Sequence, residues 1–183
     1  MSEGIAVRPS VEGDLDRIAA IYVHHVLSGL GSFEAVPPGG AEMARRRDDA
    51  LARGLPFLVA GIDGQVTGFA YAAPYRVRPA NRSTPEDSMY VDHARAGRGI
   101  GRALRGRLID ECARLGYRQR VAVIGDSGNH GSIALHARRG FARVGLLPAV
   151  GYEFGRRAGG VLMQRALGDG DRTPPVLEAW GRA

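Results

Sequence analysis

A strand followed by closely spaced glycines and then a helix is the feature that most limits what this chain can fold into. In DSMYVDHARAGRGIGRAL, residues 87–104, alternating residues predict a strand, three glycines follow at Gly97, Gly99 and Gly101, and a helical pattern begins. Glycine lets a backbone approach a ligand closely because it has no Cβ, and the N–H groups at a helix N-terminus bind anions. The stretch therefore favours a loop whose backbone amides cradle a phosphate group.

Two familiar phosphate-binding loops do not fit this stretch. A dinucleotide-binding fingerprint needs GxGxxG, but position 102 is an arginine. A P-loop needs a lysine after its glycines, and the chain contains no lysine. A loop in which successive amides and a helix N-terminus hold a pyrophosphate remains, and the glycines alone are equally consistent with a plain turn.

The rest of the pattern predicts a mixed α/β (α+β) central sheet flanked by helices. A strand is expected over 5–8, Ser10 is the expected N-cap of an amphipathic helix, and residues 56–74 predict a hairpin that turns at Asp63-Gly64. The other expected elements are a polar helix over 40–53, a strand over 88–91, a helix over 99–116, a strand over 120–125, a short helix over 128–140, and strands over 141–145 and 161–167 joined by a loop.

Composition favours one soluble domain over residues 1–168, with a loosely ordered tail over 169–183. No apolar run approaches the roughly 18 residues of a membrane span, so no membrane partner is expected. The single cysteine, Cys112, lies on the apolar face of its helix, which predicts core packing and suits the cytoplasm. All 25 basic residues are arginines and they are scattered, so the net charge of +6 does not predict nucleic-acid binding.

The stretch SMYVDHARAGRGIGRAL resembles the acetyl-CoA-binding motif of the GNAT superfamily of N-acetyltransferases. On both sides of this stretch, SFEAVPP, TPEDSMYV and GYEFGRRAGG resemble the phosphinothricin and methionine sulfoximine acetyltransferase branch of that family. The resemblance covers residues 5 to about 168. It implies the GNAT fold, acetyl-CoA as co-substrate, no metal, a small-molecule amine as substrate and a homodimer.

The resemblance also implies which residues bind acetyl-CoA. The pantetheine arm would lie along the strand at 88–91, and the amides of 97–102 would hold the pyrophosphate. The motif's first Arg or Gln falls on Ala96, with Arg95 one place early, so weakened binding is expected. The implied cofactor-binding residues are Met89, Tyr90, Val91, Gly97, Arg98, Gly99, Ile100, Gly101, Arg102 and Asn129.

The resemblance also implies two catalytic residues. The family's glutamate falls on Glu86, at the start of the strand, where it could take the proton of an amine. Asp87 is the alternative, although strand alternation sends it to the opposite face. His136, seven residues after Asn129, stands where many family members carry the group that protonates the leaving thiolate.

Phe33, Glu34, Arg76 and Arg78 are the implied substrate-binding residues, and a loop around Gly155 is expected to close over the site. The chain departs from the branch at four positions near these segments. Two functions therefore stay open beside acetylation of a small amino-acid analogue: acetylation of a protein N-terminus or polyamine, and acyl-CoA binding without catalysis. The departures are Asn81, Glu153, Arg157 and Gly159.

Overall fold

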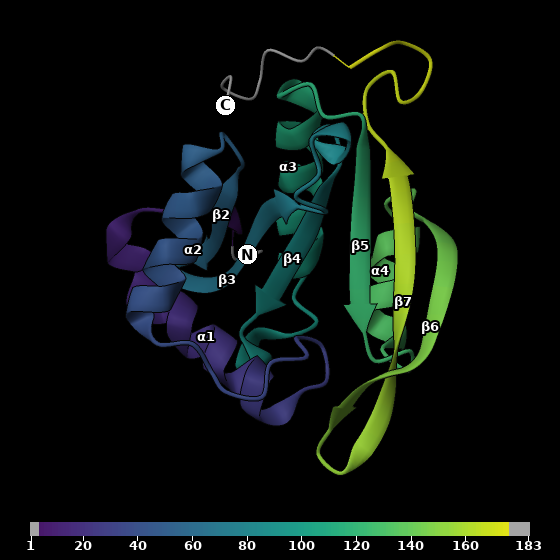
Figure 1. The fold of residues 1–183 in the computed structure, drawn as a ribbon. Coiled ribbons are helices and arrows are strands. Elements are labelled where there is room, and N and C mark those ends of the chain that lie inside the picture. The colour runs from purple at the N-terminus through teal and green to yellow at the C-terminus, as the bar shows by residue number, and fades with distance from the viewer. Residues whose placement is uncertain (1–3, 176–183) are drawn as a thin grey trace.

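The computed structural model describes residues 4–175, and the chain is organised around one seven-stranded sheet in the order β1-β2-β3-β4-β5-β7-β6 (Figure 1). Neighbouring strands are antiparallel except for β4 and β5, which are parallel. The strands are β1 (Ala6–Pro9), β2 (Phe57–Ile62), β3 (Gln65–Pro74), β4 (Pro85–Val91), β5 (Gln119–Gly125), β6 (Ala142–Glu153) and β7 (Arg156–Ala166).

Helices cover both faces of the sheet, as strand alternation on β3 shows. The ring of Phe69 faces α1, where its centroid lies 6.2 Å from that of Tyr22. Its neighbour Gly68 faces the other way, and a Cβ there would lie 3.0 Å from Ile100 of α3. Side chains on both sides of the sheet are therefore buried. The helices are α1 (Leu15–Ser28), α2 (Gly40–Ala52), α3 (Ile100–Arg114) and α4 (His130–Ala137).

The expected mixed α/β sheet flanked by helices is confirmed, and so is the order of its elements. The β2–β3 hairpin turns at Asp63 and Gly64, whose φ angles of 51° and 79° suit a two-residue turn. Cys112 is fully buried in the core. No helix among residues 4–175 is both long enough and apolar enough to span a membrane.

Two details of the sequence prediction are wrong. Ser10 does not cap α1, because its hydroxyl accepts a hydrogen bond from Arg47 Nε at 2.9 Å and a short 3-10 helix precedes α1. The loop expected before residue 161 is a long β6–β7 hairpin that turns at Phe154-Gly155. β6 is an edge strand with irregular register, and such a strand accommodates a proline such as Pro148.

The tail expected over 169–183 is described only as far as residue 175; residues 176–183 lie outside the described part. In that part Arg118 holds the chain after β7. Its guanidinium lies 3.3 Å from the Asp169 carboxylate and donates to the Pro174 carbonyl at 2.8 Å. The described beginning of the tail is therefore held by the residue that immediately precedes β5.

β4 and β5 diverge soon after they meet. Within the described residues their register consists of a single pair, Glu86 with Val121, whereas β5 and β7 pair along the whole of β5. Neighbouring strands that separate leave backbone groups without ladder partners and open a gap in the sheet. The gap lies between the C-terminal halves of β4 and β5 (Figure 1).

A buried ion cluster joins the elements around this gap. Arg105 of α3 donates to Asp87 Oδ2 of β4 at 2.9 Å, Arg120 Nη2 of β5 lies 3.6 Å from the same oxygen, and His136 Nε2 of α4 lies 3.5 Å from it. Burial by itself would raise the pKa of Asp87, but the surrounding positive charges hold it well below its usual range. One carboxylate thus ties four elements together.

Replacing Asp87 with alanine is expected to lower the free energy of unfolding by about 3–5 kcal/mol, because it leaves two buried guanidinium groups without their carboxylate. Urea denaturation followed by circular dichroism measures this loss. Asp110→Ala, on the exposed side of α3, is the matched control and should leave the midpoint almost unchanged. An Asp87→Ala variant as stable as the control would show that the cluster does not hold the fold.

Candidate active site

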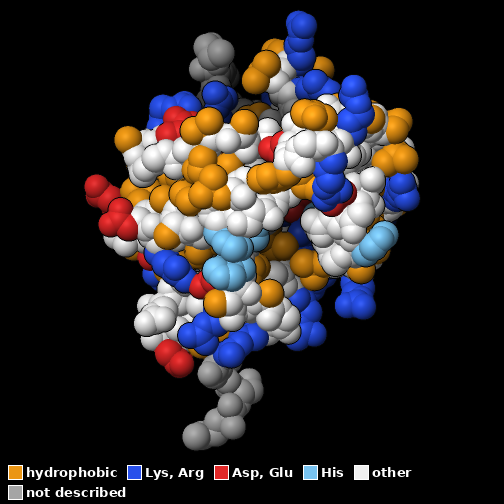
Figure 2. All heavy atoms as spheres, turned by 90° about the horizontal axis from the view of Figure 1, so that it is seen from below, with side chains coloured by type: hydrophobic (Ala, Val, Ile, Leu, Met, Phe, Trp, Pro, Cys, Tyr) orange, Lys and Arg blue, Asp and Glu red, His pale blue; other side chains and the backbone are white. Residues whose placement is uncertain are grey.

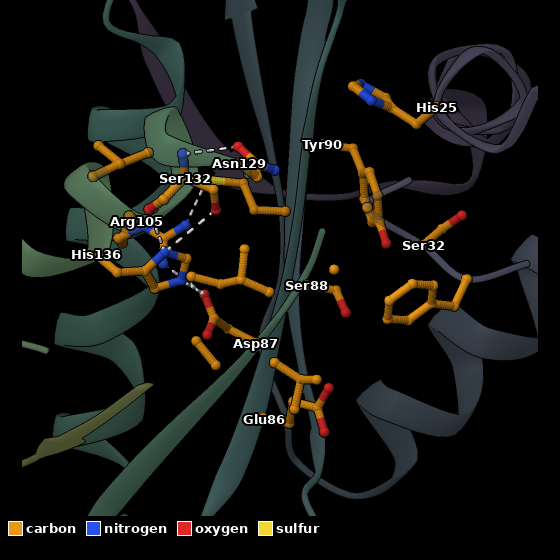
Figure 3. A pocket seen from close by; sticks show the side chains of 18 of the residues that line it. His25, Ser32, Glu86, Asp87, Ser88, Tyr90, Arg105, Asn129, Ser132 and His136 are labelled. Carbon is orange, nitrogen blue, oxygen red and sulfur yellow. Dashed lines mark hydrogen bonds and ion pairs between the residues drawn. The ribbon is translucent and has the colours of Figure 1, made fainter. Parts of the chain in front are cut away.

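A cavity of about 390 Å³ opens where β4 and β5 diverge. It reaches from α4, through the gap in the sheet, to the loop between α1 and α2 (Figure 3). The lining residues come from the loop before α2, from both diverging strands and from the helices on the two faces. They include Tyr22, His25, Ser32, Phe33, Glu34, Tyr71, Glu86, Asp87, Ser88, Met89, Tyr90, Arg105, Val123, Gly125, Asn129, Ser132, Leu135 and His136.

Alternation along β4 divides the cavity into two sides. Glu86, Ser88 and Tyr90 point toward the α1–α2 side, whereas Asp87 points toward α3 and α4 (Figure 3). His136 lies on the Asp87 side (Figure 3). The two predicted catalytic residues, Glu86 and His136, therefore line one cavity from opposite faces of the sheet.

Glu86 is half-buried and its charged form is disfavoured. The pKa of its carboxyl is raised to about 7, chiefly by burial and further by the negative charge of Asp87, while the guanidinium of Arg76 opposes the increase. A carboxyl with a pKa near neutrality can both accept and release a proton at physiological pH. Glu86 is therefore suited to act as a general base.

His136 is buried in the wall of the cavity with both ring nitrogens facing acceptors. Nδ1 lies 2.7 Å from the Ser132 carbonyl, and Nε2 faces Asp87. Because a carbonyl only accepts, Nδ1 carries a proton. Asn129 caps α4 as its sequence position predicted, since its side-chain oxygen accepts from the Ser132 N–H at 3.1 Å.

The glycine loop lies at the end of β4 and leads into α3. Gly97 and Gly99 have φ angles of 78° and 88°, a region that favours glycine, and α3 begins at Ile100. The first N–H groups of a helix have no partners within it, so this loop and the helix start present donors in succession. Seen from below, the surface is hollowed near its centre, with histidine and basic side chains around the hollow (Figure 2).

The cavity brings together only some of the residues predicted to bind acetyl-CoA. Met89, Tyr90 and Asn129 line it, whereas Val91 and residues 97–102 are not part of its lining. The two groups are nevertheless adjacent, because a Cβ on Gly101 would lie 3.4 Å from Met89 and 3.7 Å from Val91. The glycine loop thus continues the wall of the cavity along α3.

Only two of the four predicted substrate-binding residues line the cavity. Phe33 and Glu34 line the cavity, and the Glu34 carboxylate accepts from the Tyr22 hydroxyl and from Arg46, each at 2.8 Å. Arg76 and Arg78 are exposed and outside the lining, although Arg76 is close enough to influence Glu86. The loop expected around Gly155 is the turn of the β6–β7 hairpin and is also outside the lining.

Tyr22, Tyr71 and Arg105 are among the lining residues that sequence reasoning missed. Tyr22 continues the apolar stripe of α1 that includes Ile18, so the pattern indicated core packing. Tyr71 lies in the apolar run of β3, and Arg105 falls in an arginine-rich helix, where nothing distinguishes a buried arginine from exposed ones. Among the described residues no group of three His, Cys, Asp or Glu side chains could hold a metal ion.

The sequence model of the acetyltransferase (GNAT) family matches residues 21–141, which make up more than half of the chain and include all of the described cavity lining. The chain belongs to this family. The predicted family and enzyme class, an acetyltransferase, are therefore confirmed. The GNAT motif recognised in the sequence coincides with the glycine loop and the diverging strand β4.

Named relatives of this GNAT chain lie in the expected branch. It is 49% identical over 169 residues to a phosphinothricin N-acetyltransferase of Alcaligenes faecalis, an alignment that covers 92% of this chain and 86% of that protein. It is 42% identical over 163 residues to an L-methionine sulfoximine/L-methionine sulfone acetyltransferase of Salmonella typhimurium, covering 89% and 95%. The predicted branch is thereby confirmed.

Solved structures agree with the fold. The crystal structure of a GNAT superfamily phosphinothricin acetyltransferase from Sinorhizobium meliloti, in complex with AcCoA, superposes with a TM-score of 0.93 at 41% identity. The superposition covers 99% of this chain and 96% of that one. The GNAT fold expected from the sequence is the fold observed.

Glu86 is expected to titrate with a midpoint near pH 7, because burial disfavours its carboxylate. NMR of protein with ¹³C-labelled glutamate carboxyls measures the midpoint, and Glu86→Gln assigns the signal. Arg76→Ala should move the midpoint upward because it removes a positive charge that favours the carboxylate. Arg78→Ala, two residues away on the same loop, serves as the control, and a Glu86 midpoint near 4.5 would contradict the assigned environment.

Proposed function

We propose that the chain transfers an acetyl group from acetyl-CoA to the amino group of a small amino-acid-like substrate of the phosphinothricin, methionine sulfoximine or methionine sulfone type. The observation that carries this proposal is Glu86, a carboxyl with a pKa of about 7 that lines a cavity at the gap between β4 and β5. The names of the relatives, which specify these substrates, support the choice of amine.

The residues present fit acetyl-CoA. A pyrophosphate needs a row of N–H donors, which the positive-φ glycines Gly97 and Gly99 and the start of α3 supply. A pantetheine arm needs strand backbone that lacks a ladder partner on one side, which β4 supplies at Met89 beyond the single β4–β5 pair, whereas the Val91 carbonyl already lies 2.7 Å from His25 Nε2. Arg98 and Arg102 add positive charge beside this loop, and they offset the absence of a charged side chain at Ala96.

Two side chains handle the protons. When bound, acetyl-CoA would supply an acetyl thioester, which the amine nitrogen attacks at its carbonyl carbon and which then loses the thiolate of CoA. Glu86 accepts the proton that the substrate's ammonium group must lose before its nitrogen can attack. His136, on the opposite wall, gives its Nε2 proton to the departing sulfur after this nitrogen turns from Asp87, which lies 3.5 Å from it in the structure. A backbone N–H of Met89 or Tyr90 donates to the oxygen that becomes negative.

The surroundings of the cavity favour an amino acid over a polyamine. A polyamine site would present several free carboxylates, but Glu34 is already bound by Arg46 and Tyr22. Phe33 and Glu34 shape the pocket for the substrate's side chain. Arg76 and Arg78, on the exposed loop beside Glu86, attract its carboxylate and its polar oxygens.

We further propose that the chain is a cytoplasmic homodimer. The edge strand β6 and its turn expose a row of large apolar side chains, and exposed apolar patches of this kind mark interaction surfaces. Light scattering should give twice the mass of one chain. The exposed residues are Val144, Leu146, Leu147, Val150, Tyr152 and Phe154.

Release of free thiol from acetyl-CoA by the purified protein tests the reaction. Phosphinothricin, methionine sulfoximine and methionine sulfone should be acetylated quickly, whereas ordinary amino acids and a polyamine should react slowly. Faster reaction with the polyamine or with a peptide N-terminus would overturn the substrate assignment. Binding of acetyl-CoA without thiol release from any amine would show a binding module instead of an enzyme.

Glu86→Gln is expected to lower kcat/KM by about 10²–10⁴-fold, because it removes the group that takes the amine's proton. The wild-type rate should rise with pH through about 7 as Glu86 loses its proton, and the variant should lack this rise. Calorimetry should show unchanged acetyl-CoA affinity, since Glu86 precedes the strand segment that holds the cofactor. A variant that keeps the wild-type pH profile would exclude Glu86 as the base.

A further inference from the structure

The phenyl ring of Phe33 lies directly against the backbone of Gly151 on β6. A Cβ placed on Gly151 would lie 2.5 Å from Cε1, 2.7 Å from Cδ1 and 3.1 Å from Cζ of the ring. Non-bonded carbon atoms prefer separations of about 3.5–4.0 Å. The ring therefore occupies the space that any side chain at position 151 would need.

The backbone that carries this ring is held from both sides. Before Phe33, the Leu30 and Gly31 carbonyls lie so near β5 that a Cβ on Gly125 would be 2.5 Å and 2.9 Å from their oxygens. After it, Glu34 is bound by Tyr22 and by Arg46. The loop between α1 and α2 has little freedom to retreat from β6.

Phe33 itself adopts a backbone conformation that few bulky residues take, with a φ angle of 54°. Such a conformation costs of order 1–3 kcal/mol and persists only where the surroundings impose it. On the other side of the contact, the register of β6 shifts between Leu147 and Gly151, and Ala149 also has a positive φ. The irregular segment of β6 thus contacts the α1–α2 loop at Phe33, whose backbone conformation is constrained.

The ring separates Gly151 from the cavity. Phe33 is part of the cavity lining on the same side as Glu86, whereas Gly151 is absent from the described lining. The backbone of Phe33 is held in place and β6 lies against one side of its ring. The ring can therefore move only toward the cavity. Its position therefore sets how much of the cavity is free.

We propose that Gly151 is a specificity-determining residue: by lacking a side chain it lets the Phe33 ring withdraw against β6, and this sets the length of the amino-acid side chain that the cavity accepts. The proposal rests on the proposed function for its substrate class. It concerns the depth of the pocket and not the proton transfers, so it can fail while acetylation itself is real.

The test compares three sulfones that differ by one methylene: S-methylcysteine sulfone, methionine sulfone and ethionine sulfone. For Gly151→Ala, the kcat/KM ratio of methionine sulfone to ethionine sulfone, which differ by one methylene, is expected to rise about tenfold, since one methylene in a pocket is worth 10-fold or more. Gly145→Ala is the matched control, because Gly145 lies on β6 as Gly151 does. Its Cβ would lie 3.5 Å from Leu162 of β7, which is an ordinary contact distance. An unchanged ratio in Gly151→Ala would overturn the proposal.

Phe33→Leu provides the second arm. In the Gly151→Ala background the smaller side chain should return the ratio to near the wild-type value, and alone it should favour the longest sulfone. A double variant whose ratio stays shifted would show that residue 151 acts other than through Phe33. Thermal unfolding of each variant confirms that it is folded.

A crystal structure of Gly151→Ala tests whether a side chain at position 151 displaces the Phe33 ring, and it does not depend on a measured reaction rate. The expected result is a Phe33 ring turned into the cavity with β6 in place. A ring that stays where it is while β6 moves away would overturn the proposal. If the wild-type protein acetylates none of the sulfones, the substrate assignment has failed, and the ring position in this structure still decides the role of Gly151.

Discussion

The carboxylate of Asp87 is the interaction on which the arrangement of the site depends. It is buried among Arg105, Arg120 and His136, and these four residues come from β4, α3, β5 and α4. A buried carboxylate is stable only with such partners, so the cluster fixes four elements where β4 and β5 part. Because two guanidinium groups face one carboxylate, the cluster carries an excess of positive charge, and one of these groups, on Arg105, lines the cavity.

Two adjacent acidic residues, Glu86 and Asp87, have opposite environments because side chains alternate along a strand. Asp87 faces the cations of α3 and β5, which hold its pKa low and keep it charged. Glu86 faces the half-buried cavity on the other side, where burial raises its pKa to about 7. Proteins commonly assign different tasks to like groups through their environments. Here a change of one residue in register would exchange the residue proposed as the base and the residue that anchors the ion cluster.

The side of the cavity that Glu86 faces is built by segments that are distant in sequence. The loop after α1 is confined between the end of β5 and the irregular part of β6, with close approaches at Gly125 and Gly151. Arg46 of α2 completes the arrangement by binding Glu34. The hairpin in which this chain departs from the branch pattern thus contacts the pocket through its backbone, and its exposed apolar residues face away from the core.

The sequence by itself determined those structural features that arise from interactions between neighbouring residues. The Asp63-Gly64 turn, the positive-φ glycines before α3 and the Asn129 cap could be read because each depends on a few neighbouring residues. With the family motif they also predicted the fold and the place of Glu86. Only the tertiary structure decided that Arg76 lies outside the cavity, because loop positions depend on packing with distant segments. The same reason applies to Tyr22 and Arg105: burial, partners and the resulting pKa values arise from long-range contacts, which a residue's own neighbours in the sequence do not specify.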